Sequence, residues 1–211
     1  MSSTITLNEE HKALKEIASI CLEDIQPHFD SLGTCVYAAV FASQTLTEMG
    51  INHYRSHVDS YLFPADRLQP GSLTRKNLPR SRWVRCFSTS RTVDGYGMPG
   101  NNGTFRGHLI IETDNFLVDL SALQFDTPRH QVRTFGHLIV PLADLEEVEH
   151  GVWSVPIPLG RYLFCDAERP VNPASLKDVE ELFAPIIPEC VRRVRQAMTG
   201  DVAGELVCAN S

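Results

Sequence analysis

The sequence lacks the cysteine spacings that bind zinc or support dithiol exchange. Its six cysteines include no C-x-x-C pair, which excludes a zinc knuckle and a thioredoxin-like motif. The number is even, but the chain is long and shows no export signal, so we expect free thiols in a reducing cytoplasm rather than a disulfide framework. The six are Cys21, Cys35, Cys86, Cys165, Cys190 and Cys208.

Long apolar runs, a leader segment and an excess of positive charge are also absent. The longest uncharged apolar stretch, 35–47, is too short and too rich in Ser, Thr and Gln to span a bilayer. The first residues, MSSTITLNEEHKALKE, have neither the basic start nor the apolar segment of a secretory signal. The formal net charge is −7, so the overall field repels nucleic acid and anionic membranes. We therefore expect a cytoplasmic protein with no nucleic-acid or membrane partner, and its oligomeric state stays open.

What is present is typical of one medium-sized globular domain. Of the 211 residues, 43% are hydrophobic and 21% are charged. Helices first, then mostly antiparallel strands, then a helix make an α+β arrangement. We expect a single domain over 1–211, with its core at about 8–167 and a C-terminal helical segment at 175–198.

The spacing of apolar residues predicts the individual elements. It predicts helices over 8–25, with Asn8 as the cap, and over 35–50, which Gly50 ends. The C-terminal segment is helical but interrupted by Pro185 and Pro188. The predicted strands cover 51–63, 83–89, 105–111, 116–122, 135–142, 152–157 and 162–167.

Cys35 stands at the start of the second helix, which is apolar enough to lie in the core. Unpaired N–H groups and the positive dipole end at a helix start favour a thiolate, and the same N–H groups can hold an oxyanion. The other five cysteines lie in helix interiors, in strand-like runs or near the chain end. Cys35 is therefore the candidate nucleophile, against the alternative of a small buried apolar side chain.

The four residues GHLI occur at 107–110 and again at 136–139, but only the first copy is followed by a turn and a second strand. A two-residue turn at Asp114-Asn115 makes paired positions sum to 229. His108 and Asp119 then share one face as diagonal neighbours, about 7–8 Å apart at the backbone and within side-chain reach. An aspartate that accepts from one ring nitrogen leaves the other to serve a nucleophile. We therefore expect His108 to be chemical and His137 to be structural.

These residues together resemble the papain-like fold of cysteine hydrolases, especially its transglutaminase-like branch. The resemblance depends on three features: a cysteine that opens a buried helix, a strand that begins G-H-L, and F-L-V-D-L-S on the next strand. The resemblance implies a papain-like fold with N-terminal helices packed on a mostly antiparallel sheet. It also implies a catalytic triad of Cys35 as nucleophile, His108 as base and Asp119 as the acid that orients the base. Two features differ: no tryptophan follows Cys35, and Gln26 lies nine residues upstream, so the oxyanion side chain stays open.

The implied activity is cysteine-dependent acyl transfer, with a peptide, a protein or a small amide as substrate and with no cofactor or metal. Amide hydrolysis, deamidation and transamidation are equally compatible with the residues. The main alternative is a papain-like domain that has lost catalysis and binds a protein partner.

Two further alternatives depend on single motifs. HYRSH at 53–57 places two histidines four apart, but in a strand they lie about 13 Å apart, which is too far to chelate one ion. The acidic run 144–150 and the basic VRRVRQ at 191–196 are possible contact surfaces of an interaction protein. For the basic run, we expect intramolecular pairing with the acidic first helix, which stabilises little when exposed.

Overall fold

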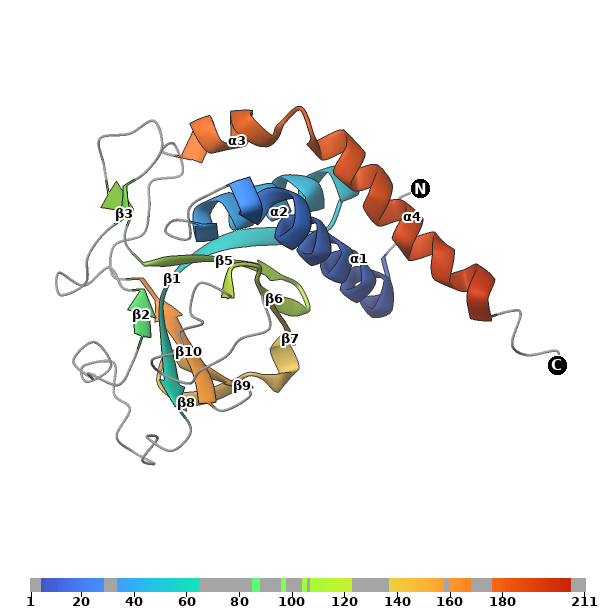
Figure 1. The fold of residues 1–211 in the computed structure, drawn as a ribbon. Coiled ribbons are helices and arrows are strands. Elements are labelled where there is room, and N and C mark those ends of the chain that lie inside the picture. Colours follow the sequence, from blue (N-terminus) through green and yellow to red (C-terminus); the bar gives the residue numbers. More distant parts are fainter. Residues whose placement is uncertain are drawn as a thin grey trace.

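The computed structural model describes residues 5–28, 34–64, 85–87, 96–97, 104–105, 107–122, 137–157, 160–167 and 176–205. Helices come first, an antiparallel sheet follows, and further helices close the described chain, as Figure 1 shows. All the strand pairings of the sheet are antiparallel. These observations confirm the expected α+β class with N-terminal helices on an antiparallel sheet.

Helix α1 (Leu7–Ile20) begins at a capping box rather than at Asn8. The Thr6 side chain accepts a hydrogen bond from the Glu9 N–H, and the Glu9 carboxylate accepts one from the Thr6 N–H. The prediction of Asn8 as the cap is therefore wrong, because Thr6 has its acidic partner at the required spacing. The helix continues as a π-helix, η1 (Cys21–Ile25), and a 3₁₀ turn, η2 (Gln26–His28).

Helix α2 (Thr34–Met49) is buried over most of its length, as its apolar sequence predicts. Gly50 ends it with a φ of 74°, a left-handed conformation that costs residues with a side chain about 1 kcal/mol or more. The N–H of Ile51 then donates to the Leu46 carbonyl, which closes the last turn. Strand β1 (His53–Pro64) follows almost at once. The helix and the strand are therefore firmly joined.

The sheet has the strand order β7-β6-β5-β1-β10-β9-β8, and β2 also pairs with β1. A separate pair is formed by β3 and β4. Strand β8 was not predicted, because its sequence, EEVE, is acidic and exposed at the edge of the sheet. The remaining strands are β2 (Arg85–Phe87), β3 (Tyr96–Gly97), β4 (Thr104–Phe105), β5 (His108–Thr113), β6 (Phe116–Asp119), β7 (Leu138–Pro141), β8 (Glu146–Glu149), β9 (Val152–Ile157) and β10 (Gly160–Asp166).

Two apolar clusters lie on opposite faces of the sheet. One face, with Leu109 and Ile111, packs under α1, α2, α3 and α4. The other face, with Ile110 and Leu117, packs against side chains of β9 and β10. In a flat sheet β6 and β10 would lie about 14 Å apart, since two strands separate them. The side chains of these strands nevertheless meet, so the sheet curls around the second cluster, as Figure 1 shows.

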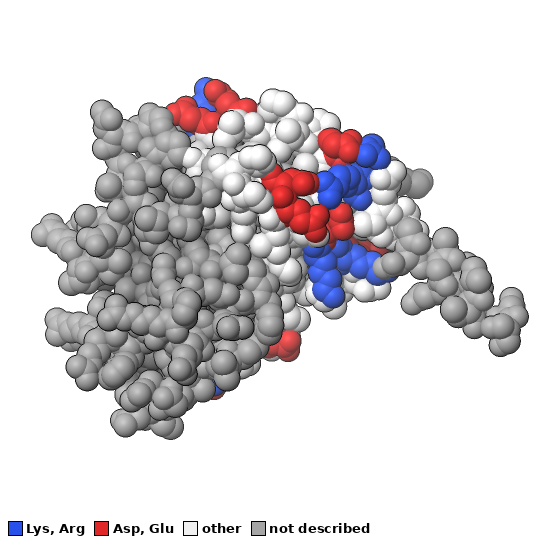
Figure 2. All heavy atoms as spheres, in the orientation of Figure 1, with Lys and Arg blue, Asp and Glu red and all other residues white. Residues whose placement is uncertain are grey.

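The C-terminal segment forms α3 (Lys177–Phe183) and α4 (Ile187–Glu205). Only Pro185 interrupts the helix, because Pro188 lies in the first turn of α4, where its missing N–H has no helical acceptor. Arg193 on α4 pairs with Asp24 on η1, which confirms the expected intramolecular pairing of the basic run. Figure 2 shows acidic and basic side chains side by side on this face.

Four thiols in the described part of the chain, those of Cys21, Cys35, Cys165 and Cys190, are free and buried. This agrees with the absence of a disulfide framework there. None of the helices within the described ranges combines the length and the apolar character that a bilayer crossing needs.

Candidate functional site

The thiol of Cys35 lies in the first turn of α2, where the sequence predicted it. Its side chain is fully buried. The helix packs against β5 and β1. The first backbone N–H groups of a helix have no acceptor within the helix, so this position offers donors beside the sulfur.

His108 and Asp119 lie on β5 and β6 in the predicted register. Ile111 pairs with Val118 and Glu112 pairs with Leu117, so each pair sums to the predicted 229. This register places His108 and Asp119 on one face, and the His108 Nε2 atom is 2.8 Å from an Asp119 carboxylate oxygen. Gly107 precedes the strand with a φ of 89°, so a glycine is required where the chain turns into it.

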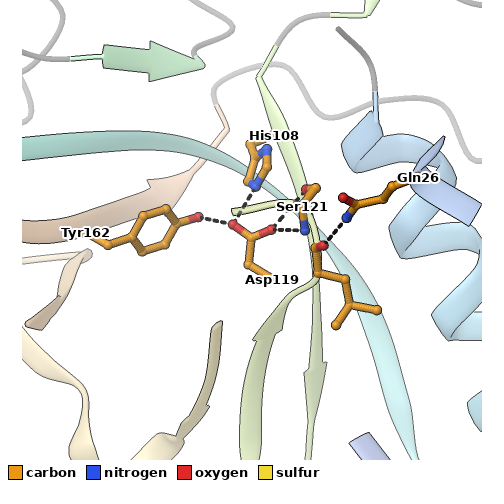
Figure 3. Close-up of polar contacts among 6 residues, drawn as sticks. Gln26, His108, Asp119, Ser121 and Tyr162 are labelled. Carbon is orange, nitrogen blue, oxygen red and sulfur yellow. Dashed lines mark hydrogen bonds and ion pairs between the residues drawn. The ribbon is translucent and has the colours of Figure 1, made fainter. Parts of the chain in front are cut away.

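The carboxylate of Asp119 accepts four hydrogen bonds in a fully buried position. Its Oδ2 atom accepts from His108 and, at 3.1 Å, from the Tyr162 hydroxyl. Its Oδ1 atom accepts from the Ser121 N–H at 2.9 Å and from the Ser121 hydroxyl at 3.0 Å. Burial opposes the charge, but His108 and Ser121 outweigh it and lower the pKa of Asp119. Figure 3 shows the donors on both sides of the carboxylate.

The imidazole of His108 is held between an acid and a thiol. Its Nε2 atom bonds to Asp119, and the ring also makes a side-chain hydrogen bond with Cys35. Burial would lower the pKa of His108, but Asp119 and Cys35 reverse this and raise the pKa to about 10. The structure therefore brings Cys35, His108 and Asp119 together around a charged imidazole.

Tyr162 on β10 is a member of the cluster that sequence reasoning missed. It follows Asp119 by 43 residues, and no local spacing links the two. Its side chain is fully buried, and burial together with Asp119 raises its pKa well above the ordinary value. The hydroxyl therefore stays protonated and remains a donor. Only the curl of the sheet brings it to the carboxylate.

Gln26 lies beside this cluster, and in sequence it is nine residues before Cys35. Its amide Nε2 atom donates to the Leu120 carbonyl at 2.6 Å, as Figure 3 shows. The bond ties η2 to the end of β6, next to Asp119. Gln26 is thus engaged in a structural link, and the backbone N–H groups at the start of α2 are the donors nearest to the Cys35 sulfur in sequence.

The other histidines singled out from the sequence have no such arrangement. His137 precedes β7 and is half-buried, and its Nδ1 atom finds no hydrogen-bond partner among the described residues. His53 bonds to Ser43 at 2.9 Å and to the Ile51 carbonyl at 2.8 Å, so it links α2 to β1. His53 and His57 lie on a strand, as expected. Within the described ranges, no cluster of three or more His, Cys, Asp or Glu residues is able to hold a metal ion.

The sequence matches no protein-family model. It matches no curated protein either. Among solved structures, the chain is similar to a crystal structure described only as a genomics target, with 12% identity and a TM-score of 0.42. That likeness covers 92% of this chain and 80% of the other.

Proposed function

We propose that the protein is a cysteine-dependent acyl-transfer enzyme with Cys35 as nucleophile, His108 as general base and acid, and Asp119 as the acid that orients the imidazole. One observation carries the proposal: a buried imidazole lies between a carboxylate at 2.8 Å and the only described thiol that starts a helix. His53, at the start of β1, is also bonded at both nitrogens, but its partners are a serine hydroxyl and a backbone carbonyl. The partners of His108 are instead a carboxylate and a thiol.

The arrangement supports a two-step reaction on an amide or ester carbonyl. His108 holds the proton taken from the thiol as an imidazolium, and the Cys35 thiolate attacks the carbonyl carbon, whose π electrons move to the oxygen. Backbone N–H groups at the start of α2 hold that oxyanion. As the bond to the leaving group breaks, the imidazolium returns the proton to the departing amine or alcohol and leaves a thioester on Cys35.

The second step releases the acyl group. The neutral imidazole of His108 takes a proton from water or from an amine, which attacks the thioester carbon, and the thiolate leaves beside the regenerated imidazolium. Water gives hydrolysis or deamidation, and an amine gives transamidation. The substrate class is therefore a carboxamide or ester of a peptide, a protein or a small molecule.

The order Cys, His, Asp, with the acid on the strand after the histidine, supports a papain-like fold of the transglutaminase-like branch. The N-terminal helices on an antiparallel sheet are compatible with that proposal. The match at the Cys35 motif is weaker, since the expected tryptophan is absent.

Alkylation of the individual thiols tests the nucleophile. The chain supplies its own controls, because Cys21 and Cys165 are as buried as Cys35. Burial raises the pKa of Cys21 to about 12, so it stays a thiol near neutral pH. Iodoacetamide at pH 7, followed by peptide mass spectrometry, should modify Cys35 at least about tenfold faster than Cys21, and His108→Ala should remove the difference because the imidazolium partner is lost.

A substrate test complements the thiol test. Activated esters and glutamine-containing peptides should leave an acyl group on Cys35, visible as a mass increase on its peptide that Cys35→Ser abolishes. Equal alkylation of all thiols and no acyl adduct would exclude the enzyme and favour a domain that binds a partner without catalysis.

A further inference from the structure

We propose that Tyr162 is a positioning residue that sets the strength of the Asp119–His108 pair through the oxygen that both donors share. The inference deepens the proposed function of the same site, because it assigns a role in the acyl-transfer triad to a strand far along the chain. Tyr162 acts through Asp119 and is not itself a catalytic residue.

The backbone of β10 holds Tyr162 rigidly. Its register pairs it with Leu62 on β1 and with Val155 on β9, so strands flank it on both sides. Its ring packs in the inner apolar cluster, tilted against Phe164 at a centroid distance of 5.9 Å. A fully buried ring between paired strands has little freedom to move. The hydroxyl is therefore a fixed donor.

This hydroxyl reaches the carboxylate oxygen that also accepts from His108, at 3.1 Å and 2.8 Å respectively. Two donors on one oxygen share its negative charge, so the tyrosine weakens the pull of that oxygen on the imidazolium. The other oxygen is fixed by Ser121. With both oxygens held, the carboxylate keeps one orientation, and Figure 3 shows His108 and Tyr162 converging on the same atom.

Several described groups face this carboxylate from the elements packed around it. His108 on β5 and Tyr162 on β10 bond to it directly. The charge of Asp119 also acts on Cys21 on η1 and on the half-buried His137 before β7. Cys35 on α2 bonds to the His108 imidazole. None of the three donates to the Oδ2 atom in a bond that the structure assigns, whereas Tyr162 does.

The test follows the His108 imidazole by ¹⁵N NMR of histidine-labelled protein, with His108→Gln to identify its signal. In Tyr162→Phe the ring stays and the donor is lost, so the pKa of His108 should rise by about 0.5–1 unit. The matched control is Tyr61→Phe. Tyr61 is equally buried but points to the opposite face of the sheet, because its neighbour Leu62 pairs with Tyr162.

A second variant gives the opposite sign. Difluorotyrosine placed at position 162 is a stronger donor, so it should lower the pKa of His108. If Tyr162→Phe does not fold, this substitution alone decides. The same pKa of His108 in the wild type and the position-162 variants, or an equal change in Tyr61→Phe, would overturn the inference.

The imidazole readout does not depend on catalysis. Wild-type Cys35 that reacts no faster than Cys21 defeats the proposed function, yet the His108 titration still decides the role of Tyr162. If the proposed function holds, the rate of Cys35 alkylation changes at the alkaline end of its pH profile as His108 loses its proton. The pH of that change should move with the pKa of His108 in each variant.

Discussion

Asp119→Asn should remove most of the dependence of stability on pH between about pH 6 and pH 9.5. The buried carboxylate keeps the His108 imidazole charged in the folded protein, with a pKa raised from 6.5 to about 10. An amide of nearly the same shape can still accept a hydrogen bond but carries no charge. Burial then dominates and lowers the pKa of His108.

The magnitude follows from the two pKa values of His108. They differ by about 3.5, and each pKa unit corresponds to about 1.4 kcal/mol, so the charged imidazole stabilises the fold by at most about 5 kcal/mol. Because the folded pKa is raised, this contribution is complete below pH 6.5 and is lost as the pH rises through 10. About 4 kcal/mol of it disappears between about pH 6 and pH 9.5.

Urea unfolding of both proteins at the two pH values measures the effect. Buried thiols such as Cys21 also destabilise the fold as the pH rises, since burial raises the pKa of Cys21 to about 12. The burial of Cys21, which is the main cause, is common to both proteins, so the comparison cancels most of this contribution. We expect the loss of unfolding free energy to be larger in the wild type by about 3–4 kcal/mol. An equal loss in Asp119→Asn would refute the assignment of the charge to His108.

Two further predictions concern the scaffold that carries the site. Gly50→Ala should lower the unfolding free energy by about 1 kcal/mol, because the φ of 74° strains an alanine although its added methyl meets no atom within 4 Å; an unchanged urea midpoint would contradict the strain. Arg193→Gln should change the unfolding free energy by less than about 1 kcal/mol, because its ion pair with Asp24 is half-exposed, and the difference should vanish in high salt. A salt-independent loss of several kcal/mol would show that the pair is not a surface one.

The hairpin of the site was predictable because its information is local. Two short apolar runs flank the turn of Asp114 and Asn115, the turn fixes the register, and the register places His108 and Asp119 on one face. The position of Cys35 was predictable for a related reason, since a buried helix must begin where its apolar run begins. That these two units meet was an inference from family resemblance, and the sequence alone does not give it.

What sequence reasoning missed depends on distant pairing or on weak propensity. Tyr162 reaches Asp119 only because β10 pairs with β1 and the sheet curls, and no spacing in the chain encodes that neighbourhood. Strand β8 has three glutamates in four residues and forms because β9 offers it an edge. Asn8 is a favourable capping residue by type, but Glu9 completes a capping box with Thr6, so the helix begins there.

The strand order has a consequence for how the chain matures during synthesis. The last strand of the sheet in sequence, β10, pairs with β1, the first, and lies in the interior of the sheet. A ribosome-bound chain therefore exposes the hairpin of β5 and β6 long before the strand that closes the sheet has been translated. The Asp119 carboxylate and the His108 imidazole are buried only after β10, which ends at Asp166, has left the exit tunnel and paired with β1. A truncated or stalled chain therefore carries Cys35, His108 and Asp119 without the burial that shifts the pKa values of His108 and Asp119.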